Sequence, residues 1–178
     1  MATDMIARAM NKKLEEDLAD ITSQRGITLQ QLGCHSIDET GYETFDSGTI
    51  IDTYLRNPLR GSNTIIFPKG IWKANINNNQ SNMTFIFEDG CIIDGVFHFA
   101  IGLGKDILPN PSTITYVENV KGIGNCVSTV RVGGYYCKNI NIDKITILDN
   151  DAKYPNQTAQ GGPAGIRFYL GVRNLTIG

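Results

Sequence analysis

The sequence predicts a mainly β chain in which short strands stack as a β-solenoid, preceded by an N-terminal α-helix and an α/β cap module. Three observations carry this prediction. An apolar stripe runs along residues 4–25, a helix-then-strand unit occupies residues 33–74, and an asparagine-led strand pattern recurs within residues 82–178. We therefore divide the chain into residues 1–26, residues 27–81 and the repeat region.

Residues 4–25 are expected to form the N-terminal helix. Its apolar residues recur at steps of four, four, four and three and make one narrow stripe on a charged helix: Ile6, Met10, Leu14, Leu18 and Ile21. Gly26 follows, as glycine often does just past a helix end. Because such a helix is marginally stable alone in water, the stripe needs a partner. The partner is either its own domain or the same helix of neighbouring subunits in a parallel bundle.

A second, shorter helix is expected inside residues 27–81. Asp46 or Ser47 can cap a helix that begins near Gly48, since a short oxygen-bearing side chain satisfies free backbone N–H groups. Asn57-Pro58 ends this helix, because the residue before proline is pushed out of the helical region. Its apolar residues lie on one face: Ile50, Ile51, Tyr54 and Leu55.

A buried strand is expected directly after this helix. Residues 64–67 are β-branched and apolar, the run breaks at Phe67-Pro68-Lys69-Gly70, and it resumes at Ile71-Trp72. An asparagine-rich connector at residues 75–82 suits a sharp corner, because asparagine tolerates left-handed backbone conformations. An ordinary helix–strand unit of an α+β domain is the alternative, and the downstream repeat favours the entry to a solenoid.

The repeat consists of asparagine followed by an apolar, a polar and an apolar residue. It occurs at residues 82–85, 139–142 and 174–177, and residues 119–123 are a looser copy with an inserted glycine. Irregular spacing between the copies fits turns that carry loops of different length. A β-sandwich is the alternative. The predicted core comprises Met83, Phe85, Phe87, Ile92, Val130, Val132, Ile140, Ile142, Ile145, Ile147, Ile166, Phe168, Leu175 and Ile177.

Composition excludes several classes of function. Among 178 residues the net charge is −2 and no basic tract occurs, so nothing indicates nucleic-acid binding. No apolar run reaches the roughly 18 residues that span a bilayer, so membrane insertion is not expected. Charged residues such as Arg8, Lys12 and Glu15 stand where the apolar core of a signal peptide would be. The repeat reaches Gly178 without a polar cap, which predicts that the chain is the N-terminal part of a longer protein.

The four cysteines are expected to be buried, reduced thiols, with an exposed redox or disulfide role as the alternative. They form no C-x-x-C pair and stand at Cys34, Cys91, Cys126 and Cys137. With only two histidines in the chain, no metal site and no cofactor are expected.

Asp149 and Asp151 are the weak catalytic candidates. They follow a predicted strand, and glycoside hydrolysis needs two carboxylates about 5–10 Å apart. A solvated turn is the alternative for such a cluster. Glu88, Asp89 and Asp94 are acidic residues near another predicted corner. Arg131 and Arg167 are expected at the surface.

Two aromatic pairs are candidates for sugar contact. Tyr135-Tyr136 and Phe168-Tyr169 lie beside the repeat, where their rings can stack on sugars. Core packing and contacts between subunits are the alternatives for these residues.

The stretch from Gly33 to Ala74 resembles the opening of the pectate-lyase-like parallel β-helix of phage tailspikes and related polysaccharide-active proteins. The resemblance rests on the polar loop, the amphipathic helix and the turn Phe67-Pro68-Lys69-Gly70. In that family a helix caps the open end of the solenoid, and an F-P-x-G turn introduces the first strands. The resemblance implies a right-handed parallel β-helix, a single-stranded solenoid.

The resemblance also implies a function. Tailspikes and tail fibres are homotrimers in the virion tail, so the N-terminal helix is expected to attach the trimer to a tail or baseplate protein. The full-length protein is expected to bind capsule or lipopolysaccharide of the host surface and to cleave it by hydrolysis or lyase chemistry. This chain is expected to attach and support rather than cut alone. The alternatives are a secreted polysaccharide lyase or hydrolase of the same fold and a non-enzymatic adhesin.

Overall fold

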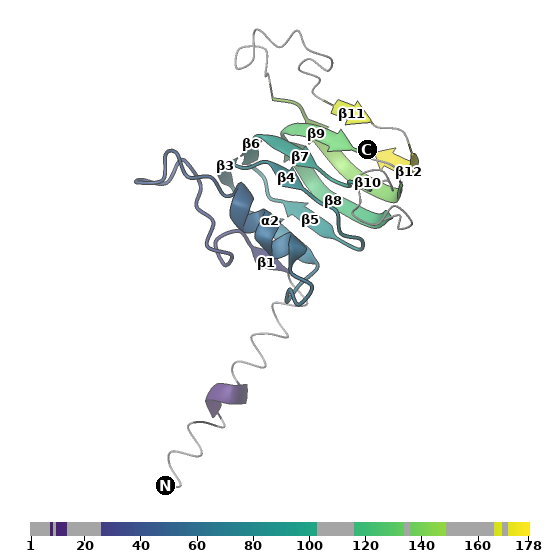
Figure 1. Ribbon diagram of the computed structural model, residues 1–178. Coiled ribbons are helices and arrows are strands. Elements are labelled where there is room, and N and C mark those ends of the chain that lie inside the picture. The colour runs from purple at the N-terminus through teal and green to yellow at the C-terminus, as the bar shows by residue number, and fades with distance from the viewer. Residues whose placement is uncertain are drawn as a thin grey trace.

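The computed structural model describes residues 8, 10–13, 26–102, 116–133, 136–148, 166–168 and 171–178. These residues form a mainly β structure, and helix α2 packs beside the sheets (Figure 1). Helix α2 spans Gly48–Arg56. The strands are β1 (Ile27–Thr28), β2 (Thr64–Phe67), β3 (Gly70–Lys73), β4 (Ile76–Asn77), β5 (Thr84–Phe87), β6 (Cys91–Asp94), β7 (Val96–His98), β8 (Val117–Val127), β9 (Thr129–Val132), β10 (Cys137–Thr146), β11 (Ile166–Phe168) and β12 (Val172–Ile177).

The strands lie in three sheets, and every strand pair in the described chain is parallel. The six-stranded sheet has the order β1-β2-β5-β8-β10-β12, the four-stranded sheet has the order β11-β9-β7-β4, and β3 pairs with β6. Consecutive strands enter the sheets in turn: β2, β3 and β4 lie in three different sheets, and β5, β6 and β7 follow in the same order. The prediction of a mainly β chain is confirmed, and parallel pairing argues against an antiparallel sandwich.

Helix α2 begins and ends where its residues predict. The Asp46 carboxylate accepts a hydrogen bond from the Gly48 backbone N–H at 2.8 Å, whereas the Ser47 hydroxyl donates to the His35 carbonyl. Asn57, with extended backbone, ends the helix before proline. Ile51 and Leu55 are fully buried in the core, so the predicted apolar face is confirmed.

The predicted break between the strands now labelled β2 and β3 is confirmed. β2 ends at Phe67 and β3 starts at Gly70, whose φ of 139° is in a region that L side chains rarely adopt. The Trp72 indole N–H donates to the Pro68 carbonyl at 2.8 Å, which holds the turn against the following strand. The chain therefore changes direction here without leaving a buried indole donor unpaired.

The four repeat asparagines share one backbone conformation and form a continuous side-chain ladder. Asn82, Asn119, Asn139 and Asn174 have φ of 60°, 58°, 56° and 55°, and in the described chain no other residue except glycine has a positive φ. Nδ2 of Asn119 donates to Oδ1 of Asn82 at 3.0 Å, Asn139 to Asn119 at 2.9 Å, and Asn174 to Asn139 at 3.0 Å. The sequence repeat therefore corresponds to one corner repeated along the six-stranded sheet.

The core lies between the three sheets and contains an aromatic cluster. Phe85 contacts Phe67, Phe97 and Phe99 with ring centroids 5.0–6.3 Å apart. Of the predicted core residues, seven are confirmed as buried: Met83, Phe85, Phe87, Val130, Val132, Ile140 and Ile142.

Other predicted core residues are not fully buried. The prediction for Ile92 was wrong by one position: Cys91 opens β6 facing inward, so alternation buries Ile93 and turns Ile92 outward. Ile147 is 49% exposed because it lies beyond the end of β10. Ile145 is partly buried. On the edge strand β12 Leu175 is partly buried and Ile177 is exposed. The side chains of Ile166 and Phe168 lie outside the described residues.

The N-terminal helix is described in part. Residues 8 and 10–13 are helical, and the Met10 side chain is 67% exposed. The other members of the predicted stripe, Ile6, Leu14, Leu18 and Ile21, lie outside the described residues.

Candidate functional site

A surface pocket lies at the start of the last three strands of the six-stranded sheet, and we call it the tyrosine pocket. β8, β10 and β12 are neighbours there (Figure 1). Its lining residues immediately precede or open these strands: Tyr116, Tyr136, Cys137, Lys138, Gly171 and Arg173. The volume of the pocket is about 200 Å³.

Strand register places the pocket residues in two adjacent columns. Glu118, Lys138 and Arg173 occupy equivalent positions of β8, β10 and β12. Two residues earlier on each strand stand Tyr116, Tyr136 and Gly171. The Val117 N–H donates to the Tyr136 carbonyl at 3.0 Å, and the Cys137 N–H donates to the Gly171 carbonyl at 3.1 Å, so the parallel ladder continues through the second column.

The two tyrosines form an exposed aromatic pair. Their ring centroids are 5.0 Å apart with an interplanar angle of 53°. Tyr116 is 55% exposed and Tyr136 is 37% exposed. Both rings therefore keep area that a ligand can cover.

The column of Glu118, Lys138 and Arg173 carries more positive than negative charge. The Lys138 ammonium contacts the Glu118 carboxylate at 2.7 Å. Arg173 is exposed on the next strand and has no ion pair among the residues that the structure describes. The column thus presents one uncompensated positive charge beside the aromatic pair.

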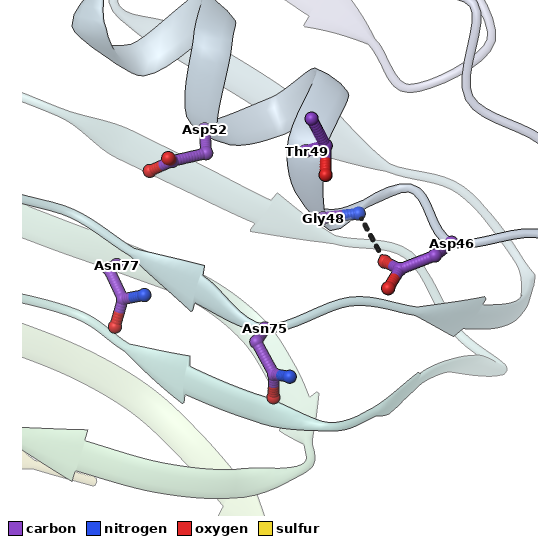
Figure 2. Close-up of a pocket in the computed structure, with 6 residues that line it drawn as sticks. All are labelled: Asp46, Gly48, Thr49, Asp52, Asn75 and Asn77. Atoms are coloured by element: carbon purple, nitrogen blue, oxygen red, sulfur yellow. Dashed lines mark hydrogen bonds between the residues drawn. The ribbon is translucent and has the colours of Figure 1, made fainter.

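A second pocket, the helix pocket, lies between α2 and the strand β4 (Figure 2). Its volume is about 240 Å³, and it is lined by Asp46, Gly48, Thr49, Asp52, Asn75 and Asn77. Three of its side chains already hold the fold together. Asp46 caps α2, Asp52 pairs with Arg56 at 2.7 Å, and Oδ1 of Asn75 accepts from the Val96 N–H at 3.0 Å.

Three polar side chains of the helix pocket therefore have partners at the start of α2, within α2 and on β7. Oδ1 of Asp52 is buried without a hydrogen-bond partner, while Oδ2 carries the contact with Arg56. In the described part of the chain, no group of three or more His, Cys, Asp or Glu residues is arranged to hold a metal ion.

The predicted catalytic candidates Asp149 and Asp151 lie outside the described residues. Glu88 and Asp89 are exposed in the turn between β5 and β6, and Asp94 ends β6 half-buried. The structure thus places none of these three acids in the two pockets.

The cysteines are buried free thiols, as predicted. Burial raises the pKa of Cys34 to about 11 and that of Cys91 to about 12, and it also raises the pKa of Cys126 and of Cys137. A thiol with a raised pKa stays protonated at neutral pH and is a poor nucleophile and metal ligand. The thiols therefore act as small core side chains.

His98 is the buried histidine of β7. Its Nε2 lies 3.1 Å from the Gly133 carbonyl. Burial lowers the pKa of His98 to about 4, the contact with Gly133 opposes this shift, and the charge of Arg131 adds to it. Arg131 itself is half-buried rather than fully at the surface as predicted, and the side chain of Arg167 lies outside the described residues.

Of the aromatic residues predicted to contact sugars, Tyr136 lies in the tyrosine pocket. Tyr135 and Tyr169 lie outside the described residues, and Phe168 ends β11 with a side chain that the structure does not describe. The aromatic partner of Tyr136 is instead Tyr116, which was not among the predicted site residues.

Comparison of the chain with protein-family models, curated proteins and solved structures gives no match. A search of the described helices finds none with the length and hydropathy of a membrane span.

A signal for the missed pocket residues was present in the sequence. Three of the four repeat asparagines carry this signal: Asn119, Asn139 and Asn174. The residue before each of them is Glu118, Lys138 or Arg173, and three residues before each stands Tyr116, Tyr136 or Gly171. Aligning the copies at Asn119, Asn139 and Asn174 superposes Tyr116 on Tyr136 and Lys138 on Arg173. The asparagines of the repeat mark the strands, and the residues just before them line the pocket.

Proposed function

We propose that this chain is a right-handed parallel β-helix component of a phage tailspike or tail fibre, which attaches to the virion tail and supports recognition of host-surface glycans. The asparagine ladder is the observation that carries the β-helix part of the proposal. A ladder that joins one side chain to its equivalent in the next turn requires identical corners stacked in register. Parallel strands that enter three sheets in turn have the same requirement.

The glycan part of the proposal is supported by the tyrosine pocket. Exposed aromatic rings next to cationic donors offer both a stacking face and hydrogen bonds, which is the combination that fixes a polar ring-shaped ligand. Capsule and lipopolysaccharide of the host surface present such rings in long repeats. Depolymerisation belongs to the full-length protein in this proposal.

The attachment part of the proposal rests on the N-terminal helix. Its stripe residue Met10 is strongly exposed in the single chain, and an exposed apolar stripe is stabilised by covering it with the same helix of two neighbours. The homotrimer would then present three helices to a tail or baseplate protein.

The solution mass of the chain, measured by sedimentation equilibrium, tests this proposal. A mass near three times the 19.6 kDa chain is expected, and the double variant Met10→Asp, Leu14→Asp is expected to be monomeric. The variant Arg8→Asp, Lys12→Asp changes charge on the opposite face of the same helix and serves as the control. A monomeric wild-type chain would contradict the tailspike proposal and favour a secreted polysaccharide lyase or hydrolase of this fold.

A measurement of activity, rather than of mass, distinguishes a non-enzymatic adhesin from a depolymerase. A trimeric full-length protein that binds host capsule without shortening it would be an adhesin, whereas one that shortens it would be a depolymerase. Size-exclusion chromatography of the capsule after incubation distinguishes the two.

A further inference from the structure

We propose that the tyrosine pocket binds a carboxylate-bearing sugar residue, so that the glycan recognised by this chain is acidic. The inference rests on the glycan recognition proposed above and names the chemistry of the ligand. Three features of the pocket support it: the ring pair, the glycine that opens the pocket and the charge balance of the column Glu118, Lys138 and Arg173.

The ring pair provides one wall of the pocket. Tyr136 and Tyr116 stand in consecutive turns of the sheet with ring centroids 5.0 Å apart, and both are partly open to solvent. Aromatic side chains bury large areas and carry a polar hydroxyl at one end, so they bind ligands that have an apolar face and a polar rim. A pyranose ring is such a ligand.

Gly171 provides the space. It occupies the position in β12's turn that the tyrosines occupy before β8 and β10, and its φ of 94° is one that L side chains rarely adopt. A third aromatic ring in this column would cover the face of Tyr136. Because the backbone conformation favours glycine there, the position beside Tyr136 stays open instead.

The charge balance selects an anionic ligand. Lys138 is matched by Glu118 at 2.7 Å, which leaves Arg173 as the uncompensated charge at the rim of the pocket within the described chain. A guanidinium presents paired N–H donors that match the two oxygens of a carboxylate. The Lys138 ammonium has three donors, and its contact with Glu118 leaves the others for ligand oxygens.

The size of the pocket limits how much of a glycan enters it. Its volume of about 200 Å³ is below the roughly 300–1,000 Å³ that encloses a drug-sized ligand. We therefore expect one acidic sugar residue to sit in the pocket while the rest of the chain runs along the surface.

Titration of ¹⁵N-labelled chain with glucuronic acid and, separately, with glucose tests this inference. These two sugars differ by a carboxylate in place of a hydroxymethyl group. Glucuronic acid is expected to shift the backbone amide resonances of Tyr136, Lys138, Gly171 and Arg173 and to bind about three- to tenfold more tightly than glucose. Equal affinity for the two sugars, shifts located elsewhere, or no shift at about 50 mM ligand would overturn the inference.

Matched variants separate a specific contact from general attraction. Arg173→Gln and Lys144→Gln each remove one positive charge from exposed positions of neighbouring strands. Arg173→Gln is expected to abolish the preference for glucuronic acid, and Lys144→Gln is expected to keep it. Tyr136→Ala should weaken the binding of both sugars, while Tyr136→Phe, which keeps the stacking face, should retain it. Equal effects of the two charge variants would overturn the role of Arg173.

A competition with inorganic phosphate separates an acidic sugar from a general anion site. Phosphate that displaces glucuronic acid at equal concentration would show that the sugar ring contributes nothing and would overturn the inference. A trimeric chain that fails to bind glucuronic acid would overturn this inference and leave the proposed attachment standing. A monomeric chain that binds glucuronic acid would support the acidic-sugar site and contradict the proposed tailspike function.

Discussion

Two columns of side chains on the same sheet follow opposite rules. The ladder column repeats one residue type in four successive turns: Asn82, Asn119, Asn139 and Asn174. The column one residue earlier changes at every turn, from Ser81 to Glu118, Lys138 and Arg173. The ladder column must adopt a left-handed backbone, whereas the neighbouring column only has to point outward. The comparison teaches that the backbone fixes the first column and leaves the second available for a ligand.

The inward face of the same sheet should be the most sensitive to substitution. Phe85→Ala removes a fully buried ring from the aromatic cluster, so we expect the free energy of unfolding to fall by about 3–5 kcal/mol. Urea denaturation followed by circular dichroism measures it. Ile86→Ala, on the opposite face of the same strand, is the control and is expected to cost about 1 kcal/mol. Equal losses would contradict the assigned face of β5.

Substitutions in the asparagine ladder should cause the next largest loss of stability. Asn119→Ala places a Cβ residue without a polar group at φ 58° and removes two ladder hydrogen bonds. We expect a loss of about 2–3 kcal/mol in the free energy of unfolding. Asn119→Gly keeps the backbone conformation accessible and should lose about 1–2 kcal/mol, from the hydrogen bonds and chain entropy. If both variants have the same free energy of unfolding as the wild type, the ladder does not stabilise the corner.

The pH dependence of stability tests the buried histidine. The pKa of His98 in the folded chain is about 4, below its ordinary value of 6.5. The unfolded chain therefore binds more protons between these values, and stability falls as the pH drops from about 6.5 towards 4, by at most about 1.4 kcal/mol per pH unit. His98→Gln should flatten this part of the profile in urea denaturation measured from pH 4 to pH 7. A wild-type profile that is flat over this range would contradict the burial of the imidazole.

Substitutions in the column one residue before the ladder should affect stability least. Lys138→Gln breaks an exposed ion pair with Glu118, and exposed pairs are worth about 0–1 kcal/mol. We expect thermal unfolding to shift slightly, with a similar shift for Glu118→Gln. A loss as large as that of Asn119→Ala would mean that this column is part of the fold rather than a free surface.

The sequence predicted the elements that local chemistry determines. The cap at Asp46, the stop before Pro58 and the break at Pro68 are short-range effects, and each is confirmed. The repeat also located the asparagine corners, because a left-handed position restricts the residue types that can occupy it.

What the sequence analysis missed depends on long-range register. The inward phase of β6 is set by the turn that precedes Cys91, so a choice between Ile92 and Ile93 could not be made from apolar character alone. The tyrosine pocket joins residues from three turns of the sheet separated by loops of different length. Recognising it requires the repeat copies to be aligned with one another as β8, β10 and β12 are paired, because no single stretch of sequence contains all of its residues.

Side-chain amide contacts in solution test the central claim most directly. Nuclear Overhauser spectra of ¹⁵N-labelled chain can report whether the side-chain NH₂ protons of Asn119 lie near those of both Asn82 and Asn139. The account predicts both contacts, and a third between Asn139 and Asn174. Absence of these contacts, together with Hα–Hα contacts typical of antiparallel pairs, would contradict the stacking of parallel turns on which the proposed β-helix rests.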